Sequence, residues 1–317
     1  GHVAVVTGGS RGFGFLIARE LAPAGCPVVI AARDAAELER ARQALAQDGA
    51  EVLTVVCDVA DREQAERLVD AARARFGRVD ILVANAGIIQ VGPVESMTPA
   101  DFEQAVGIMY WGVVYPALAV LPEMRERRHG HIVNVTSIGG MVSVPRLLPY
   151  NSAKFAAVGF SEGLAAELDK DGVRVTTVVP GLMRTGSYLN AQFTGRQEIE
   201  FGWFSLGSTL PLISMDAERA ARRVVQAIQR GEREVITTLP ANVLARFHGL
   251  FPGTTVALLG LANRLLPSAG TVTGQRPGKD VQATLSPAAR TPLRVATALG
   301  RSAARRFNQI GPADPPV

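Results

Sequence analysis

Two side chains that can exchange protons, Tyr150 and Lys154, lie four residues apart. On a helix this spacing places both on one face, one turn from each other. A phenol has a reference pKa of about 10. One ammonium about 4 Å away, at an effective dielectric near 20, would lower that pKa by roughly three units. The pair therefore predicts a tunable proton donor and acceptor, although the spacing alone also fits a helix that carries both residues without chemistry.

The elements that must position this pair follow from an alternation along the chain. Apolar, β-branched runs alternate with amphipathic helical stretches, which indicates an α/β fold with a parallel sheet covered on both faces. We expect a Rossmann-type, doubly wound, seven-stranded sheet with its ligand crevice at the carboxyl ends of the strands. The expected strands are residues 2–7, 27–32, 51–57, 79–84, 131–136, 173–179 and 234–237, and the expected helices are residues 12–24, 35–47, 62–76, 99–126, 148–169 and 216–230.

A glycine-rich turn, residues 7–14, joins the first expected strand to the first helix. Glycines there allow a tight turn and a close approach of the backbone to a diphosphate. The helix N-terminus adds free N–H groups and a partial positive charge. The expected cofactor contacts in this turn are Gly8, Ser10, Arg11, Gly12, Phe13 and Gly14.

The end of the second strand bears on the choice of cofactor. An acidic residue there would bind the ribose hydroxyls of NAD, but this chain has Ala32 followed by Arg33. Arg33 and Arg11 could converge on a 2′-phosphate, which favours NADP over NAD. Asp34 remains an alternative ribose ligand, or it caps the helix that follows.

Polar and small residues also follow the other strands. After the third strand, Asp58 could accept a hydrogen bond from adenine or cap the next helix. Ser137 ends the fifth strand, thirteen residues before Tyr150, and could face the same crevice. The remaining expected cofactor contacts at strand ends are Val59, Asn85, Ala86, Gly87, Pro180, Gly181, Met183 and Thr185.

Together these motifs, in this order and spacing, resemble the short-chain dehydrogenase/reductase family of the single-domain type, over about residues 3–240. The resemblance implies a nicotinamide cofactor and interconversion of an alcohol and a carbonyl. It implies that Tyr150 is the general acid/base and that Lys154 lowers its pKa and holds the nicotinamide ribose. It further implies that Ser137 binds the substrate oxygen and Thr185 the carboxamide, and that helices 99–126 and 148–169 form homodimer or homotetramer contacts.

One position departs from the family pattern. Met109 stands where the family usually has an Asn that supports a water chain to the lysine, and a thioether cannot replace that amide. Three readings follow: a proton relay by another route, a slow enzyme, or a cofactor-binding sensor or scaffold without turnover. If the missing Asn is limiting, Met109→Asn should raise the rate.

Residues 186–214 are expected to form a substrate lid, with glycines that permit movement. The segment carries five aromatic residues, which predict either a roomy apolar pocket for a bulky substrate or packing of the lid onto the sheet. These aromatic residues are Tyr188, Phe193, Phe201, Trp203 and Phe204.

Residues 241–317 are expected to form a partly helical, basic extension to a catalytic domain of residues 1–240. They contain nine Lys and Arg against two Asp, a net charge of +7, which leaves −3 for the first 240 residues. We expect helices at 243–251 and 255–266, a linker at 267–287, and a basic amphipathic helix at 290–307. That helix could lie on a membrane, although packing over the pocket or another subunit is favoured. Deletion from residue 241 is expected to leave NADP(H) binding intact.

The composition limits the remaining classes of function. Hydrophobic residues make up 47% of the chain and charged residues 20%, as in folded soluble proteins. The two cysteines fit neither a metal site nor a disulfide, and no leader sequence is evident, so we expect a cytoplasmic protein without a metal. The acidic balance of the first 240 residues argues against nucleic acid as a partner. The sequence therefore predicts an NADP(H)-dependent oxidoreductase of a bulky apolar alcohol or carbonyl, with a membrane-associated reductase of lipid or steroid-like substrates as an alternative.

Overall fold

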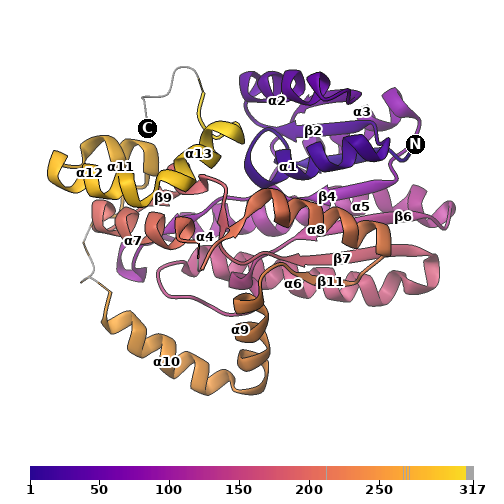
Figure 1. The fold of residues 1–317 in the computed structure, drawn as a ribbon. Helices are drawn as coiled ribbons and strands as arrows, with labels where there is room; N and C mark the ends of the chain where they lie inside the picture. Colours follow the sequence, from indigo (N-terminus) through magenta and orange to yellow (C-terminus); the bar gives the residue numbers. More distant parts are fainter. Residues whose placement is uncertain (212, 267, 269, 271, 312–317) are drawn as a thin grey trace.

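The computed structural model describes residues 1–211, 213–266, 268, 270 and 272–311. Its central feature is a seven-stranded sheet in the order β11-β7-β6-β4-β1-β2-β3, in which every neighbouring pair is parallel (Figure 1). The predicted fold class is confirmed. The strands are β1 (Ala4–Thr7), β2 (Val28–Ala32), β3 (Val52–Val56), β4 (Ile81–Ala84), β6 (Gly130–Val135), β7 (Val173–Val179) and β11 (Glu234–Ile236).

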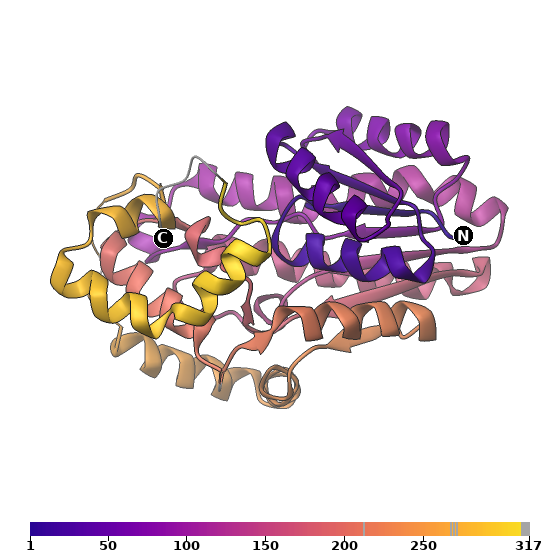
Figure 2. The same ribbon diagram turned by 45° about the horizontal axis from the view of Figure 1, so that its top comes forward.

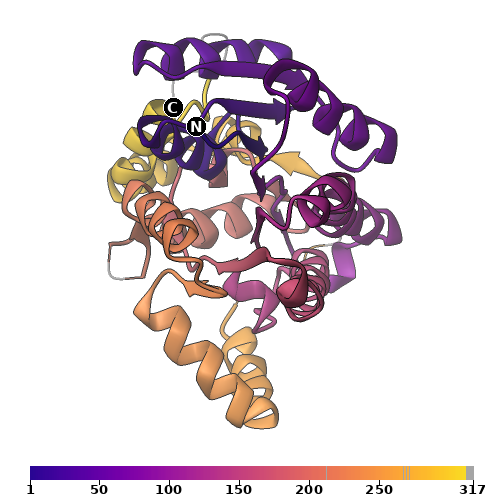
Figure 3. The ribbon, with the colours of Figure 1, turned by 90° about the vertical axis from the view of Figure 1, so that its right-hand side faces the viewer.

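Helices cover both faces of the sheet because its strands are apolar on both sides. α1 (Gly12–Leu21), α2 (Ala35–Gln47) and α8 (Ala217–Arg230) form one layer. α3 (Arg62–Phe76), α5 (Gly112–Glu126) and α6 (Leu148–Leu168) form the other. The N-terminus lies at the opposite end of the sheet from the C-terminal helices (Figure 2), and the two helical layers flank the strands in Figure 3.

Local capping fixes where several helices begin. The carboxylate of Asp34 accepts a hydrogen bond from the backbone N–H of Glu37 at 2.8 Å, so Asp34 is the N-cap of α2. The N-cap of α3 is Asp61, not Asp58, whose carboxylate instead accepts from the N–H of Ala60. Asp34 therefore has the capping role that the sequence left open, whereas Asp58 does not.

The long helix expected at 99–126 is divided into α4 (Pro99–Val106), a π-helical segment η3 (Gly107–Trp111) and α5. Met109 lies within the π-helical segment and is fully buried. The whole stretch of 28 residues is long and apolar enough to cross a membrane by length and composition. Half of its most apolar window is buried, however, and it packs against α3, α6 and β4, as a core helix does.

Short elements connect the sheet to the lid. β5 (Gln90–Val91), β9 (Gln192–Phe193) and β12 (Arg276–Pro277) form a small sheet that joins the lid to the C-terminal segment. β8 (Met183–Arg184) pairs with β10 (Met215–Asp216) beside the lid helix α7 (Gln197–Thr209). Single turns lie at η1 (Ala22–Ala24), η2 (Val94–Ser96), η4 (Ile138–Gly140), η5 (Asp169–Asp171) and η6 (Ser187–Leu189).

The C-terminal segment differs in part from its prediction. The two expected helices are present as α9 (Leu239–Leu250) and α10 (Pro252–Arg264), which stand away from the body as a hairpin (Figures 1 and 3). The expected linker contains β12 and α11 (Gly278–Thr284), and the single basic helix expected at 290–307 is two helices, α12 (Pro287–Ala296) and α13 (Ala298–Arg306). Pro292 lies inside α12, and Thr297 ends α12 and begins α13.

Candidate active site

The glycine-rich turn is held against the end of β4 by a small set of hydrogen bonds. The Thr7 hydroxyl accepts from the N–H groups of Asn85 and Ala86, at 3.0 and 3.2 Å, and the Asn85 amide donates back to the Thr7 carbonyl. Gly8 and Gly12 have φ values of +62° and +58°, a left-handed conformation that favours glycine. These bonds fix the turn at the point where the strand order reverses.

Gly14 has a different role from the other glycines of the turn. It does not line the cavity described below, and a Cβ there would collide with the Gly8 carbonyl and the Asn85 amide. Gly14 thus permits close packing of α1 against the turn. Its direct contact with the cofactor stays a prediction.

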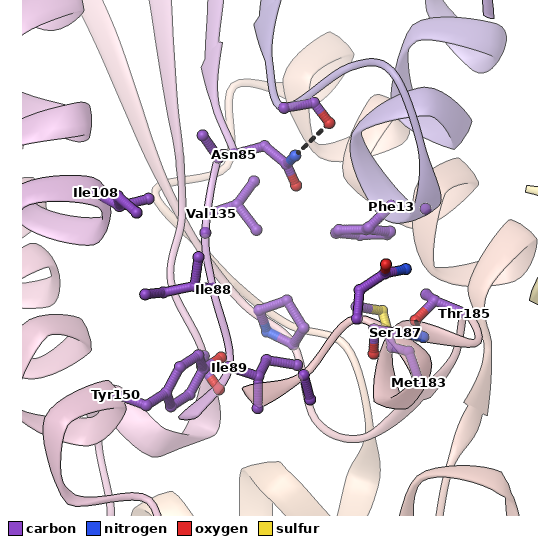
Figure 4. A pocket seen from close by; sticks show the side chains of 18 of the residues that line it. Phe13, Asn85, Ile88, Ile89, Ile108, Val135, Tyr150, Met183, Thr185 and Ser187 are labelled. Atoms are coloured by element: carbon purple, nitrogen blue, oxygen red, sulfur yellow. Dashed lines mark hydrogen bonds between the residues drawn. The ribbon is translucent and has the colours of Figure 1, made fainter. Parts of the chain in front are cut away.

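One cavity of about 890 Å³ opens at the carboxyl ends of the strands. It brings together all of the sequence-predicted site residues except Gly14. Figure 4 shows Tyr150 and Ile108 on one side of it, and Phe13, Met183, Thr185 and Ser187 on the other. The predicted residues that line it are Gly8, Ser10, Arg11, Gly12, Phe13, Arg33, Asp58, Val59, Asn85, Ala86, Gly87, Ser137, Tyr150, Lys154, Pro180, Gly181, Met183 and Thr185.

Tyr150 and Ser137 meet at the centre of this cavity, and their side chains are hydrogen-bonded. Ser137 follows β6 in an extended conformation, and its hydroxyl also accepts from the N–H of Gly139 at 3.1 Å. Burial raises the pKa of Tyr150, and the hydrogen bond to Ser137 partly offsets that rise. The phenol is thus a proton donor whose orientation is already fixed.

Lys154 lies on α6 one turn after Tyr150, as the spacing predicted. Its ammonium donates to the Val135 carbonyl at 2.8 Å and lies 6.0 Å from the centre of the Tyr150 ring. Burial lowers the pKa of Lys154 to about 8. Lys154 is not among the causes of the shift at Tyr150, so the expectation that Lys154 lowers the pKa of Tyr150 stays a prediction.

The first turn of α2, just after β2, carries an acidic side chain that was not predicted as a site residue. Glu37, in the first turn of α2, accepts hydrogen bonds from Arg11 at 2.6 Å and from the Ser10 hydroxyl at 2.7 Å. Arg11 therefore has a competing anionic partner beside the cavity. No local pattern in the sequence marks this contact, because Arg11 and Glu37 are 26 residues apart.

The lid aromatic residues divide between the two expected roles. Tyr188, Phe193 and Phe201 are fully buried and pack with Val281 and Leu285 of the C-terminal segment. The other two, Trp203 and Phe204, line the cavity. The lid is thus partly a small hydrophobic core and partly a wall of the site.

A buried ion pair fixes the lid to the loop that precedes the tyrosine. Arg146 and Glu200 lie 2.7 Å apart, and Glu200 also accepts from the indole N–H of Trp203 at 2.6 Å. Burial raises the pKa of Glu200, whereas Trp203 and Arg146 lower it. The contacts orient Trp203 within the cavity wall.

Residues of the C-terminal segment that lack any sequence motif also reach the cavity. Leu244 of α9 and Gln309, after α13, both line it. The Phe307 carbonyl accepts from the Gly12 N–H at 2.8 Å. The C-terminal segment therefore packs against the cavity and the glycine-rich turn, and the effect of its deletion on NADP(H) binding stays a prediction. The division of the chain at residue 240 stays a prediction.

Outside the cavity, His2, Asp80 and His129 lie close enough together to suggest a cation site. The buried Asp80 carboxylate, however, already accepts from the N–H of Val3 and from Arg78 and Arg127, at 2.8, 3.0 and 3.1 Å. Two guanidinium groups at the carboxylate oppose a further cation. This cluster is a structural anchor for the start of β1.

A parallel, doubly wound sheet with a glycine-rich turn at its switch point defines the chain as an α/β dinucleotide-binding protein. The chain belongs to the short-chain dehydrogenase/reductase family, because the family model for short chain dehydrogenases matches residues 2–192. The predicted resemblance is confirmed, and the protein is an oxidoreductase of this type that uses a nicotinamide cofactor.

Relatives and solved structures extend over most of the chain. It is 36% identical to SadH of Mycobacterium tuberculosis over 258 residues, 78% of this chain and 91% of that protein. It is 30% identical to a fatty acyl-CoA reductase of Acinetobacter baylyi over 278 residues, 87% of this chain and 89% of that protein. A short-chain dehydrogenase/reductase of Burkholderia phymatum in complex with NAD has a TM-score of 0.74 at 28% identity, covering 80% of this chain and 95% of that one. A metagenomic short-chain oxidoreductase in complex with NADP has a TM-score of 0.61 at 28% identity, covering 75% and 98%.

Proposed function

We propose that this protein is an NADP(H)-dependent oxidoreductase that interconverts a secondary alcohol or long-chain alcohol with its ketone or aldehyde. The observation that carries the proposal is that Ser137, Tyr150 and Lys154 line one cavity with the glycine-rich turn. The turn also fits the cofactor: a Cβ at Gly8 would meet the Ala86 backbone at 2.9 Å, so only glycine lets the turn lie this close to the end of β4, where a dinucleotide would bind.

The chain's own residues would act as follows. A bound nicotinamide dinucleotide supplies or accepts the hydride. The Tyr150 hydroxyl donates a proton to the substrate oxygen in the reductive direction and accepts it in the oxidative direction. The Ser137 hydroxyl, fixed by the Gly139 N–H, holds that oxygen, and the Lys154 ammonium, fixed on the Val135 carbonyl, holds the cofactor ribose. Thr185 would bind the carboxamide.

The preference for NADP rests on charge at the end of β2. Arg11 and Arg33 line the cavity, and Ala32 stands where a ribose-binding carboxylate would favour NAD. Asp34 is occupied as the N-cap of α2. Glu37 opposes the preference for NADP, because its carboxylate pairs with Arg11. The positive charges of Arg11 and Arg33 must therefore attract a 2′-phosphate more strongly than this one carboxylate repels it.

The substrate class follows from the walls of the cavity. Many of the side chains that line the cavity with Tyr150 are apolar, and a relative at 30% identity is a fatty acyl-CoA reductase. We therefore infer a bulky, lipophilic alcohol or carbonyl substrate. The apolar residues of the wall are Ile88, Ile89, Ile138, Val144, Leu147, Leu182, Trp203, Phe204 and Leu244.

The proposal is tested by the oxidation of NADPH and NADH against ketones and aldehydes of increasing chain length. We expect NADPH to be the better donor and kcat/KM to rise with chain length. Tyr150→Phe should lower kcat by a factor of about 10² to 10⁴ and leave the Kd of NADPH within about twofold. No turnover across the panel, with tight NADPH binding, would instead favour a cofactor sensor or scaffold.

A second part of the proposal concerns the hairpin of α9 and α10, which we infer lies on an anionic membrane surface. Its apolar side chains are unusually exposed: Leu250 is 74% exposed and Leu265 is 85% exposed. From residue 235 to 279 the chain has no Asp or Glu, whereas Arg246 and Arg264 carry positive charge. Apolar area together with only basic charges suits anionic lipid.

The hairpin replaces the segment first expected to meet a membrane. The basic residues 290–307 fold back on the body, where Ala303, Ala304 and Phe307 are buried. Leu244 places α9 beside the cavity, so a membrane-bound hairpin would bring the cavity close to lipophilic substrates.

A reducing cytoplasm is also part of the proposal. The described Cys26 and Cys57 are free and buried, and burial raises the pKa of Cys57 to about 11.

Assembly into a homodimer or homotetramer through α4, α5 and α6 remains part of the same proposal. Trp111, Leu118 and Phe155 are exposed apolar side chains on this stretch of helices. Such side chains are typical of a contact between subunits. The molecular mass in solution tests this part.

A further inference from the structure

The last described residues of the chain lie directly on the cofactor-binding turn. We call residues 307–310 the C-terminal strap. The Phe307 carbonyl accepts from the Gly12 N–H at 2.8 Å, and the Asn308 amide donates to the carbonyls of Ser10 and Glu37 at 2.7 and 3.1 Å. The Phe307 ring is buried in the core formed by α1, α2 and α8. Contacts that join residues 298 positions apart thus anchor the strap at the turn.

The orientation of the Gln309 amide is fixed by its neighbour Asn190. The Asn190 Nδ2 donates to the backbone carbonyl of Gln309 at 3.2 Å and to its Oε1 at 2.7 Å. A backbone carbonyl can only accept, so the Asn190 nitrogen must face Gln309, and Oε1 must be the acceptor in the second bond. The Gln309 Nε2 therefore points the other way.

That nitrogen lies over Gly12. A Cβ built on Gly12 would be 2.5 Å from Nε2 of Gln309. Gln309 is 8% exposed and lines the cavity, and no described residue accepts a hydrogen bond from its Nε2. The rest of Gln309 is buried, and its Nε2 is not among the buried polar atoms that lack a partner, so this donor is open to the cavity, where a ligand can supply the acceptor.

We propose that Gln309 is a cofactor-binding residue whose Nε2 donates a hydrogen bond to the diphosphate of the bound dinucleotide. The glycine-rich turn and the N-terminus of α1 define where a diphosphate binds. The N–H of Gly12, which could otherwise serve as a donor there, is taken by Phe307, and Gln309 places an amide donor over the same glycine. The inference rests on a nicotinamide dinucleotide occupying this cavity.

The proposal changes what deletion of the C-terminal segment should do. A chain that ends at residue 240 loses the Phe307 contact and the Gln309 donor together. Dinucleotide binding should then weaken, contrary to the expectation from the sequence. Because Ala303, Ala304 and Phe307 are also buried, the deletion could act through folding, so point variants give the cleaner test.

The test compares Gln309→Met, which removes the amide, and Gln309→Glu, which replaces it with a carboxylate, by calorimetric titration. NADP⁺, NAD⁺ and ADP-ribose carry the diphosphate, whereas adenosine 2′-monophosphate does not. We expect the Kd of the diphosphate ligands to rise about fivefold in Gln309→Met and about thirtyfold or more in Gln309→Glu. The Kd of adenosine 2′-monophosphate should stay within about twofold. Gln43→Glu, on the exposed face of α2, controls for the added charge.

The outcomes separate this inference from the proposed function. Unchanged Kd values for the diphosphate ligands in both Gln309 variants would refute the role of Gln309 alone. An equal loss for adenosine 2′-monophosphate would show general damage to the site and would also refute it. If the unmodified protein binds no dinucleotide at all, the cofactor assignment fails, and the inference fails with it.

Discussion

The ammonium of Lys154 is bonded to the carbonyl of Val135 at 2.8 Å, and its side chain is only 4% exposed. A buried ammonium with one backbone acceptor costs stability, which is why burial lowers the pKa of Lys154 to about 8. The bond holds the positive charge within the cavity, one helical turn from Tyr150. The residue therefore reduces the stability of the fold while serving the site.

The first prediction concerns the stability of Lys154→Met. The folded pKa of about 8 is below the unfolded value near 10.4, so the unfolded state binds more protons between these pH values. The contribution of Lys154 to stability thus rises from pH 8 to pH 10. At pH 7 we expect Lys154→Met to be more stable than the unmodified protein by up to about 3 kcal/mol. The stability of the variant should not rise between pH 8 and pH 10, and the variant should lose turnover.

Thermal unfolding followed by circular dichroism from pH 7 to pH 10 measures this effect. Lys170→Met, at an exposed lysine in η5, is the matched control and should leave the unfolding temperature nearly unchanged. A Lys154→Met variant that is less stable at pH 7 would contradict the prediction.

The second prediction concerns cofactor choice at the pair of Arg11 and Glu37. Glu37→Gln removes the carboxylate 2.6 Å from the Arg11 guanidinium and frees it for a 2′-phosphate. We expect the ratio of kcat/KM for NADPH to that for NADH to rise about tenfold, and to fall about tenfold in Arg11→Ala. Glu39→Gln removes a carboxylate of the same helix that pairs with Arg42 and should leave the ratio unchanged. Equal ratios in all three variants would rule out Arg11 as a reader of the phosphate.

The third prediction concerns Met109, the residue in place of the family's Asn. Met109 is fully buried, and its sulfur is 3.7 Å from the position of a Cβ on Gly87. An amide in this apolar surrounding would lack partners, so Met109→Asn should cost about 1–3 kcal/mol of stability. Because the Lys154 ammonium already has the Val135 carbonyl, we expect kcat to change less than about threefold.

Chemical denaturation and steady-state kinetics measure both effects, and Met109→Leu controls for the loss of the thioether. A rise in kcat of tenfold or more in Met109→Asn would show that the missing amide limits the proton relay.

The fourth prediction concerns the hairpin of α9 and α10. Leu258 and Leu261 of α10 are both more than half exposed. The double variant Leu258→Glu, Leu261→Glu should lose at least tenfold of its partitioning to liposomes that contain phosphatidylserine, because each carboxylate opposes both burial and anionic lipid. Val94→Glu, at an exposed valine of η2, should still float with the liposomes. If the double variant instead halves the molecular mass in solution, the hairpin joins two copies of the chain.

The sequence by itself determined the framework of this protein. The alternation of apolar strands and amphipathic helices predicted the parallel sheet, and the glycine-rich turn and the spacing of Tyr150 and Lys154 predicted one cavity at its edge. These features could be predicted because their causes are local: side-chain period, backbone freedom at glycine and hydrogen bonds within a few residues. Asp34 shows the limit, because both a cap and a ribose ligand fitted its position until the Glu37 N–H was seen to take its carboxylate.

Only the tertiary structure decided which residues share the cavity from distant parts of the chain. Gln309 lies over Gly12, Glu37 holds Arg11, and Tyr188 is buried in the lid instead of facing the substrate. The same long-range packing buries Phe307, from the stretch expected to be a basic amphipathic helix, and leaves Leu265 exposed, from an apolar helical stretch. Such contacts leave no local pattern, because they depend on which surfaces the folded chain brings together and which neighbours then satisfy each polar group.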